Sequence, residues 1–355
     1  MRIGIPREIK TLEGRVGLVP AACAELIKAG HTVFVETNAG VLSGYNDDAF
    51  RTVGAHIAVD AAALYGQAEL IVKVKEPIEP ELGLLRREHT LFSYLHLAPA
   101  PVLTQRLLDI GLTAVAFETV EEGGLLPLLA PMSDIAGRLA IQIGATLLQQ
   151  PQGGKGLLLG GLPAAERGKV VVVGAGVAGG NAARMAADMG ATVTVFDPQR
   201  DKLERMRALG SNVTGLYPFA DDVRAAVVAA DLVVGAVLVT GEKAPHVIDR
   251  AAVARMGKGS VIVDISVDQG GCVETTRATT YADPTYVVDG VTHFCVTNMP
   301  GAVPRTASQA LSAALIPYVR RLAGAQWRDH AGLRLGINVE GGQVIHAGLR
   351  RSMGL

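Results

Sequence analysis

Three glycines in the middle of the chain, Gly174, Gly176 and Gly179, have the spacing G-x-G-x-x-G directly after a valine-rich run that starts at Lys169. A bound pyrophosphate needs a tight turn, close approach of the backbone and a free helix N-terminus, and this pattern allows all three. Asp197 ends the next apolar run, where a carboxylate can accept hydrogen bonds from both ribose hydroxyls of an adenosine. A glycine turn that serves only packing is the alternative, but the surrounding pattern favours a dinucleotide site.

Two more candidates lie at the ends of apolar segments in the first third of the chain. Lys73 and Lys75 are two residues apart in LIVKVKEP, and Lys75 is the better functional candidate because it comes at the end of the run. The alternative is a pair of solvated lysines at a sheet edge. His96 ends the run TLFSYLHL and could carry protons near neutral pH, although a lone histidine there is more often a core or rim residue.

The segment SVIVDISVDQGGC offers two aspartates. Asp264 lies inside the expected strand, and we expect a structural role or a hydrogen bond to a neighbouring loop. Asp268 lies beyond the strand, where Gly270 and Gly271 permit close backbone approach, so it is the better site candidate. A turn or capping aspartate is the alternative for Asp268. Arg15, in the polar loop after the first apolar run, would be dismissed as a surface residue on its own.

Taken together, these residues could bind a small acid and support its oxidation. Arg15 could bind a substrate carboxylate bidentately, and Lys75 could polarise a carbonyl or hold the same carboxylate. His96 could exchange protons with a nitrogen or oxygen on the reacting carbon, while a dinucleotide takes a hydride from that carbon. The implied substrate is a small 2-amino or 2-hydroxy acid, bound in a cleft between two domains.

Apolar strand candidates alternate with helical patterns from the first residue onward, which favours an α/β fold with two doubly wound parallel-sheet domains, one of them a Rossmann domain. The expected strands are residues 2–5, 32–36, 70–75, 90–97, 113–118, 169–173, 192–196, 212–216, 232–237, 260–265 and 286–288. Residues 133–150 are expected to form a long helix with Ser133 as its N-cap. A later helix at residues 306–322 is expected to return to the first domain. The predicted domains are therefore residues 1–128 plus 305–355, for the substrate, and 129–304, for the dinucleotide.

Composition narrows the functional classes. The 355 residues carry a formal net charge of −1, so no global field attracts nucleic acid or an anionic membrane. No signal-peptide core begins the sequence, and no apolar stretch approaches the roughly 20 residues of a spanning helix. The three cysteines are scattered, which argues against a disulfide framework or a zinc site. We expect a cytoplasmic enzyme without a bound metal and without nucleic-acid or membrane partners.

A series of ordered blocks resembles the L-alanine dehydrogenase family, and the resemblance runs from the first residues to about Leu322. The blocks are GIPREIKTLEGRV, LIVKVKEP, LFSYLHLA, LLAPMSDIAGRLA, GGKGLLLGG, VVVVGAGVAG, VDISVDQGGC and VTNMPGAVPRT. The resemblance implies NAD-dependent, reversible oxidative deamination of L-alanine to pyruvate and ammonia. It also implies a homohexamer, and a fold shared with the NAD-binding part of proton-translocating transhydrogenase.

The resemblance also implies roles for individual residues. Arg15 and Lys75 match substrate-binding positions, His96 matches the acid/base residue, and Asp268 matches a second catalytic residue. The positions that match NAD contacts are Ser133, Gly174, Gly176, Val177, Ala178, Gly179, Asp197, Lys202, Val237, Leu238, Ile265, Asp268, Arg277, Asn298 and Met299. The segment from Ala323 to Leu355 is expected to diverge from the family, as are Leu42 and Tyr45.

Two other functions stay open on sequence grounds. A 2-hydroxyacid dehydrogenase can have a similar two-domain layout, with a catalytic histidine late in the nucleotide domain, and His293 is available there. A non-catalytic NAD-binding module, like the soluble part of transhydrogenase, is the second alternative. Such a module would not need Arg15, Lys75 and His96 together.

Overall fold

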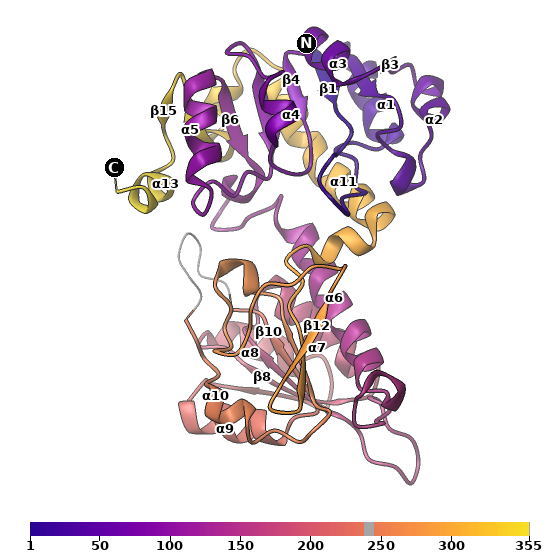
Figure 1. Ribbon diagram of the computed structural model, residues 1–355, viewed down its shortest axis with the longest axis vertical. Coiled ribbons are helices and arrows are strands. Elements are labelled where there is room, and N and C mark those ends of the chain that lie inside the picture. Colours follow the sequence, from indigo (N-terminus) through magenta and orange to yellow (C-terminus); the bar gives the residue numbers. More distant parts are fainter. Residues whose placement is uncertain (238–244, 355) are drawn as a thin grey trace. The chain divides into compact units, whose positions relative to one another are not determined.

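The computed structural model describes residues 1–237 and 245–354, and the chain divides into two compact units (Figure 1). Unit 1 consists of Met1–Met132 together with Gly301–Leu355, and unit 2 consists of Ser133–Pro300. Helix α6 (Ala130–Leu147) and the short helix η5 (Met299–Ala302) contain the two points where the chain passes from one unit to the other. Within the described residues, none of the helices is long and apolar enough to cross a bilayer.

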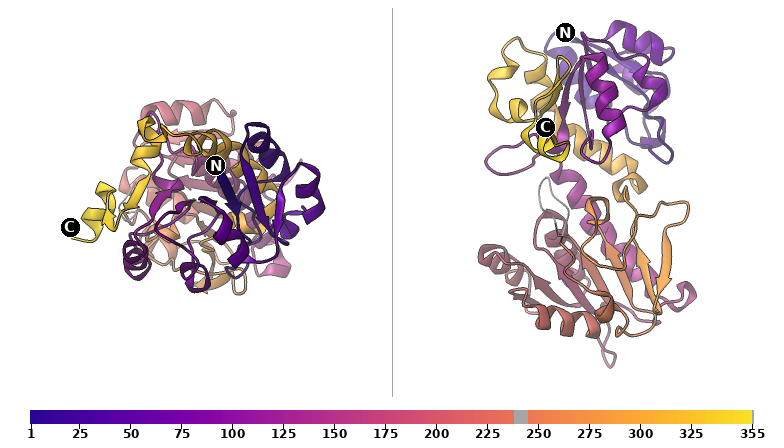
Figure 2. Two further views of the ribbon diagram at one scale, coloured as in Figure 1. Left: turned by 90° about the horizontal axis from the view of Figure 1, so that it is seen from above. Right: turned by 60° about the vertical axis from the view of Figure 1, so that its left-hand side comes forward.

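The described residues of unit 1 form an eight-stranded sheet in the order β15-β14-β6-β5-β4-β1-β2-β3. Strands β1 to β6 pair in parallel, whereas β14 runs antiparallel to both β6 and β15. The strands are β1 (Arg2–Ile5), β2 (Thr32–Glu36), β3 (His56–Ala58), β4 (Leu70–Val72), β5 (Thr90–Ser93), β6 (Thr113–Ala116), β14 (Ile337–Glu340) and β15 (Gln343–Val344). The C-terminal segment, yellow in Figure 2, therefore extends the sheet beyond β6.

Helices and short helical turns connect and cover these strands. They are α1 (Pro20–Lys28), η1 (Val41–Ser43), α2 (Asp47–Thr52), α3 (Ala61–Gln67), α4 (Glu79–Leu82), α5 (Pro101–Ile110), η2 (Phe117–Thr119), α11 (Pro304–Leu322), η6 (Trp327–Asp329), α12 (Ala331–Leu335) and α13 (Ala347–Ser352). Helix α11 starts with proline at its first position and buries Ala307, Leu311, Leu315 and Val319, which recur every four residues on one face. Its buried face packs against α1 and η1.

Unit 2 contains a second sheet, in the order β12-β13-β11-β10-β7-β8-β9. Its pairs are parallel except that β12 is antiparallel to β13. The strands are β7 (Lys169–Val173), β8 (Thr192–Phe196), β9 (Val213–Leu216), β10 (Leu232–Gly235), β11 (Val261–Asp264), β12 (Thr285–Val288) and β13 (Val291–Phe294). The described helices are η3 (Gln150–Gln152), α7 (Val177–Asp188), α8 (Arg200–Arg207), α9 (Ala220–Ala229), α10 (Arg250–Val253) and η4 (Val267–Gln269).

The two sheets have the same strand order over their parallel part. Counted from its first strand, and with the antiparallel β12 of unit 2 left out, each runs 3-2-1-4-5-6. The order reverses between β1 and β4 in unit 1 and between β7 and β10 in unit 2. Ligands of such sheets bind beyond the carboxyl ends of the strands at this switch point. Valine and isoleucine fill the central strands because both faces of a parallel sheet are covered.

The expected α/β fold with two doubly wound, mainly parallel sheets is confirmed. Four strands have the expected bounds (β1, β2, β7 and β8). The expected N-cap role of Ser133 is wrong, because α6 already begins at Ala130 and Ser133 lies within it. The strand expected at residues 70–75 is also too long, since β4 ends at Val72 and leaves both lysines beyond it.

Candidate active site

Arg15, Lys75 and His96 all follow carboxyl ends of strands in the unit 1 sheet. Arg15 lies in the loop after β1, Lys75 comes three residues after β4, and His96 comes three residues after β5. Because β1, β4 and β5 are neighbours in the sheet, the topology places all three segments at the same edge. Two of these strands, β1 and β4, flank the switch point at which α/β sheets bind ligands.

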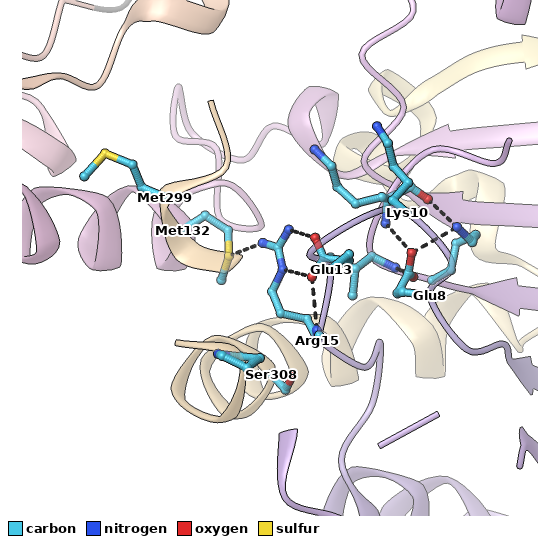
Figure 3. A network of polar contacts seen from close by, with 12 residues as sticks. Glu8, Lys10, Glu13, Arg15, Met132, Met299 and Ser308 are labelled. Carbon is cyan, nitrogen blue, oxygen red and sulfur yellow. Dashed lines mark hydrogen bonds and ion pairs between the residues drawn. The ribbon is translucent and has the colours of Figure 1, made fainter. Parts of the chain in front are cut away.

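Arg15 is held by a carboxylate that the sequence did not reveal as part of the site. Its Nε donates to Glu13 Oε1 at 2.7 Å and its Nη2 donates to Glu13 Oε2 at 2.5 Å, while Nη1 lies 3.1 Å from Met132 Sδ (Figure 3). Both Arg15 and Glu13 are buried. Burial opposes the charge of the guanidinium, but the pairing with Glu13 outweighs it and raises the pKa of Arg15.

The pairing with Glu13 limits which side of the Arg15 guanidinium could bind a substrate carboxylate. Glu13 already accepts from the Nε–Nη2 edge of the guanidinium, so a substrate carboxylate would meet the Nη1 side, where Met132 lies. Glu13 also offsets the positive charge of Arg15, which makes the nearby Lys75 more important for attracting an anion. Arg15 and Glu13 line a cavity of about 420 Å³, and the loop after β2 contributes Asn38 and Leu42 to it.

Lys73 and Lys75, which are two residues apart in the sequence, have different burial and different charged partners in the structure. Lys73 is fully buried, and its Nζ lies 3.1 Å from Glu8 Oε2 and 3.1 Å from Glu81 Oε1. Lys73 therefore belongs to a buried ion cluster that joins the β1 loop to α4. The Lys75 side chain is 17% exposed, and its Nζ lies 3.9 Å from Glu76 Oε2.

Lys75 is the lysine whose charge is easier to remove. Burial, followed by weaker effects from Arg15 and Lys10, lowers the pKa of Lys75, although Glu76 acts in the opposite direction. In contrast, Glu8 and Glu81 together raise the pKa of Lys73 against its burial. A partly accessible ammonium with a lowered pKa suits substrate binding better than a fully paired one.

His96 lies just past β5 with φ +47, in the left-handed region that non-glycine residues rarely adopt. Its side chain is 39% exposed, and its ring stacks on Tyr94 with a centroid distance of 5.9 Å and an interplanar angle of 8°. Tyr94 is buried, its hydroxyl donates to Leu128 O at 2.5 Å, and burial raises its pKa. The Tyr94 ring is thus a fixed support for the imidazole.

In unit 2, two of the three glycines in the turn have a steric reason to be glycine. A Cβ on Gly179 would lie 1.8 Å from Gly174 O, and a Cβ on Gly174, which has φ +97, would lie 2.5 Å from Ala236 O. A Cβ on Gly176 would meet nothing within 4 Å. Gly176 is also the N-cap of α7 and has no side-chain cap. The turn is therefore closely packed on its inner side and open where a phosphate would approach the helix N-terminus.

Asp197 follows β8 directly, and its side chain is hydrogen-bonded to the backbone of this glycine turn. Its Oδ2 accepts from Ala175 N at 2.8 Å, its Oδ1 accepts from Gln199 N at 2.9 Å, and Lys202 Nζ lies 3.7 Å from Oδ2. Each carboxylate oxygen has a second lone pair that a ribose hydroxyl could use. The carboxylate is therefore held in place by backbone amides before any ligand binds.

Helix α6 packs closely against the glycine turn. A Cβ on Gly137 would lie only 2.1 Å from Ala178 O, and Asn181 Nδ2 donates to Asp134 Oδ1 at 2.7 Å. Ser133 precedes Gly137 by four residues, so both lie on the same face of α6. This places Ser133 on the face of α6 that is turned toward the start of α7.

The two aspartates at and beyond the end of β11 have different surroundings. Asp264 is buried, and its carboxylate accepts from Ser266 N at 2.9 Å, Cys272 N at 3.1 Å and Thr276 Oγ1 at 2.7 Å. The expected structural role of Asp264 is thereby confirmed. Asp268 is exposed in η4, just before Gly270 with φ +98.

The remaining cofactor candidates are distributed over several loops of unit 2. Ile265 donates its N–H to Gly235 O at 2.8 Å, which joins the ends of β10 and β11. The Arg277 guanidinium lies 4.2 Å from the centre of the Tyr286 ring, and Met299 O accepts from Tyr281 Oη at 2.8 Å. Val237 and Asn298 are both half-buried. Leu238 lies outside the described residues.

His293, the candidate histidine of the 2-hydroxyacid dehydrogenase alternative, is a core residue. It is 0% exposed, its Nδ1 is 3.0 Å from Val291 O, and its Nε2 is 2.8 Å from Thr275 Oγ1. Both ring nitrogens are thus engaged inside the protein.

The described part of the chain contains no group of three His, Cys, Asp or Glu side chains placed to hold one metal ion. That the protein needs no metal stays a prediction.

Comparisons with known proteins agree over the whole chain. Residues 4–136 match the family model "Alanine dehydrogenase/PNT, N-terminal domain", and residues 140–347 match "Alanine dehydrogenase/PNT, C-terminal domain". The chain is 48% identical to an alanine dehydrogenase of Halomonas elongata, over 100% of this chain and 97% of that one. It is 46% identical to an alanine dehydrogenase of Bacillus subtilis, over 100% and 95% of the two chains.

Solved structures give the same result. An L-alanine dehydrogenase structure superposes with a TM-score of 0.96 at 47% identity, covering 100% of this chain and 99% of the other. A transhydrogenase from Sinorhizobium meliloti has a TM-score of 0.86 at 24% identity, covering 98% and 99%, and shows likeness of fold alone. The match to the family model extends to residue 347. The expectation that the chain diverges from the family directly after Leu322 is therefore wrong.

Proposed function

This chain belongs to the alanine dehydrogenase family, and we propose that it catalyses the reversible oxidative deamination of L-alanine to pyruvate and ammonium. The observation that carries the proposal is the set of groups at the carboxyl edge of the unit 1 sheet. A buried guanidinium, a partly accessible lysine and a histidine follow neighbouring strands there. They are the groups needed to bind a small carboxylate and to move a proton on its α-substituent.

The residues of unit 2 fit a nicotinamide dinucleotide, and we propose that this is NAD. Gly176 leaves open space beside the start of α7, while Gly174 and Gly179 leave no room for a side chain inside the turn. The Asp197 carboxylate would accept from the ribose hydroxyls and repel the 2′-phosphate of NADP. When bound, the dinucleotide would supply the hydride acceptor for alanine oxidation.

The substrate carboxylate would bind Lys75 and the Nη1 side of Arg15. The Cα hydrogen leaves with its electron pair, the amine loses a proton, and the resulting 2-iminopropionate adds water. His96 would take the proton from that water and return it to the nitrogen as the C–N bond breaks and ammonia leaves. Asp268, by its match to the family motif, is proposed to orient the nitrogen or stabilise its positive charge.

Other parts of the proposal rest on the family resemblance. The proposed NAD contacts outside the glycine turn are Ser133, Val177, Ala178, Lys202, Val237, Leu238, Ile265, Arg277, Asn298 and Met299. We also propose a homohexamer in the cytoplasm, and two domains with the boundaries 1–128 plus 305–355 and 129–304.

The experiment that tests the function is NADH oxidation by the purified protein with pyruvate, with and without ammonium. We expect turnover only when both are present, and weaker turnover with glyoxylate or 2-oxobutyrate. Pyruvate reduction that needs no ammonium would instead identify a 2-hydroxyacid dehydrogenase. NADH binding without turnover of any 2-oxo acid would support the non-catalytic alternative.

A further inference from the structure

The backbone at His96 needs an explanation beyond its own sequence. His96 has φ +47, and a residue with a Cβ occupies this left-handed region only where the surroundings hold it. Neither a glycine nor a tight hairpin is present to account for it, since the segment continues from His96 through Leu97 and Ala98 to the N-terminus of α5. The cause must therefore lie in what contacts this backbone.

The contact is the Glu118 carboxylate, which comes from η2 at the end of the neighbouring strand β6. Glu118 Oε1 accepts from His96 N at 2.6 Å, and both carboxylate oxygens accept from Leu95 N, at 3.2 and 3.3 Å. Two successive N–H groups that converge on one anion form a concave binding site in which one residue takes the left-handed conformation. The backbone of residues 95–96 thus binds a carboxylate supplied by the protein itself.

The same carboxylate also faces the imidazole. His96 Nδ1 lies 3.9 Å from Glu118 Oε1, and the side chain of Glu118 is only 16% exposed. The carboxylate thus lies on the Nδ1 side of the ring, which leaves Nε2 as the nitrogen that would exchange protons with substrate. The stacked Tyr94 ring restricts the imidazole from one face, so Glu118 and Tyr94 together set its position.

We infer that Glu118 is the positioning residue of His96: it fixes the backbone conformation and the ring orientation of the acid/base residue. This inference rests on the proposed function, in which His96 carries the protons. Glu118 is not among the residues proposed to bind substrate or dinucleotide. It is therefore expected to affect turnover only through His96.

A double-mutant cycle tests this dependence. Glu118→Gln keeps the size of the side chain but removes the charge and one of the two acceptor oxygens. We expect kcat to fall about 10- to 100-fold, as for a small displacement of a catalytic group, with KM for NADH unchanged. In a His96→Ala background the same substitution should change kcat less than about twofold, because the group it positions is gone.

Glu121→Gln is the matched control, since Glu121 is an exposed carboxylate three residues further along the chain. It alters the net charge equally and should leave kcat unchanged. Melting temperatures of all variants separate a local effect from unfolding. An equal loss of kcat from Glu118→Gln in both backgrounds, or no loss in the wild-type background, overturns the inference.

A second measurement does not depend on activity and so distinguishes this inference from the function itself. Diethyl pyrocarbonate acylates neutral imidazole, and mass spectrometry reports the rate at each histidine peptide. Glu118→Gln should speed modification of His96 by about threefold or more, because the ring loses the carboxylate that faces Nδ1 and is less restricted toward the reagent. The rate at the exposed His56 should not change. An unchanged rate at His96 contradicts the inference even if the protein turns over alanine, and an increased rate supports it even if alanine is not the substrate.

Discussion

Both units have a sheet with the same 3-2-1-4-5-6 order, yet they differ in the connection between the first strand and the first helix. In unit 2, β7 ends at Val173 and α7 begins at Val177, so three residues of glycine turn lead directly into a helix. In unit 1, β1 ends at Ile5 and α1 begins only at Pro20. The long loop between them carries Glu8, Glu13 and Arg15.

The starts of the two helices differ in the same way. The N-terminus of α7 is open, with Gly176 facing empty space. The start of α1 is covered by α11, where Ser308 Oγ accepts from Val16 N at 3.0 Å and Ser312 Oγ accepts from Val19 N at 2.9 Å. One topological position thus presents an open helix N-terminus in one unit and a long loop with charged side chains in the other.

The largest effect should come from removing His96, the proposed proton carrier of unit 1. His96→Ala is expected to lower kcat by about 10²- to 10⁴-fold while NADH binding is retained. Steady-state kinetics and a fluorescence titration with NADH measure the two properties, and His56→Ala provides a control in the same unit. If activity stays near normal at every pH, His96 is not the proton carrier and the division of roles between the units fails.

The glycine turn of unit 2 offers a matched pair of substitutions. Gly176→Ala places a methyl group where the pyrophosphate would approach, so we expect the Kd for NADH to rise about 10- to 100-fold with little change in stability. Gly179→Ala instead pushes a Cβ into Gly174 O and should lower the melting temperature. Calorimetric titration and thermal unfolding separate the two. Equal effects of both variants on stability would show that the turn serves packing only.

Asp197 should set the preference between NADH and NADPH. Asp197→Asn removes the charge and keeps an acceptor oxygen for one of the two amides that Asp197 binds, those of Ala175 and Gln199. We expect the ratio of kcat/KM for NADH to that for NADPH to fall about tenfold, aided by the nearby Lys202. Tighter binding of NADPH than NADH by the unaltered protein would refute the NAD assignment.

The smallest effect concerns the pH dependence of substrate binding in unit 1. The pKa of Lys75 is lowered, so its charge is lost as pH rises through a value below that of an ordinary lysine. KM for pyruvate should therefore rise on the alkaline side of neutrality. Lys75→Arg keeps the charge and should flatten this rise, although absolute activity is expected to drop severalfold. Identical pH profiles would mean that Lys75 does not bind the carboxylate.

Much of the fold could be predicted because the central parallel strands are apolar and rich in β-branched residues. The bounds of β7 and β8 follow from their valine runs. The strands β14 and β15 were not expected, since they are short and depend on antiparallel pairing with β6, which is far away in sequence. Helix α6 starts before Ser133 because Ala130, Pro131 and Met132 are compatible with a first turn.

The site was predictable only in part. Residue type and position at strand ends identified Lys75 and His96, and the sheet order brings these two residues to the same edge. Glu13 and Glu118 were missed because their importance lies in particular partners. A glutamate two residues before an arginine is a weak signal, and Glu118 contacts a backbone 22 residues earlier in the chain. Such pairings become visible only in three dimensions.

One measurement tests the central claim, that this protein oxidises alanine by hydride transfer from Cα. L-alanine deuterated at Cα is incubated with NAD and the protein, and the reduced dinucleotide is isolated and analysed by mass spectrometry. The reduced dinucleotide is expected to carry the deuterium, and ammonium and pyruvate are expected to form in equal amounts. Reduced dinucleotide without deuterium, with the label released to water, would contradict it.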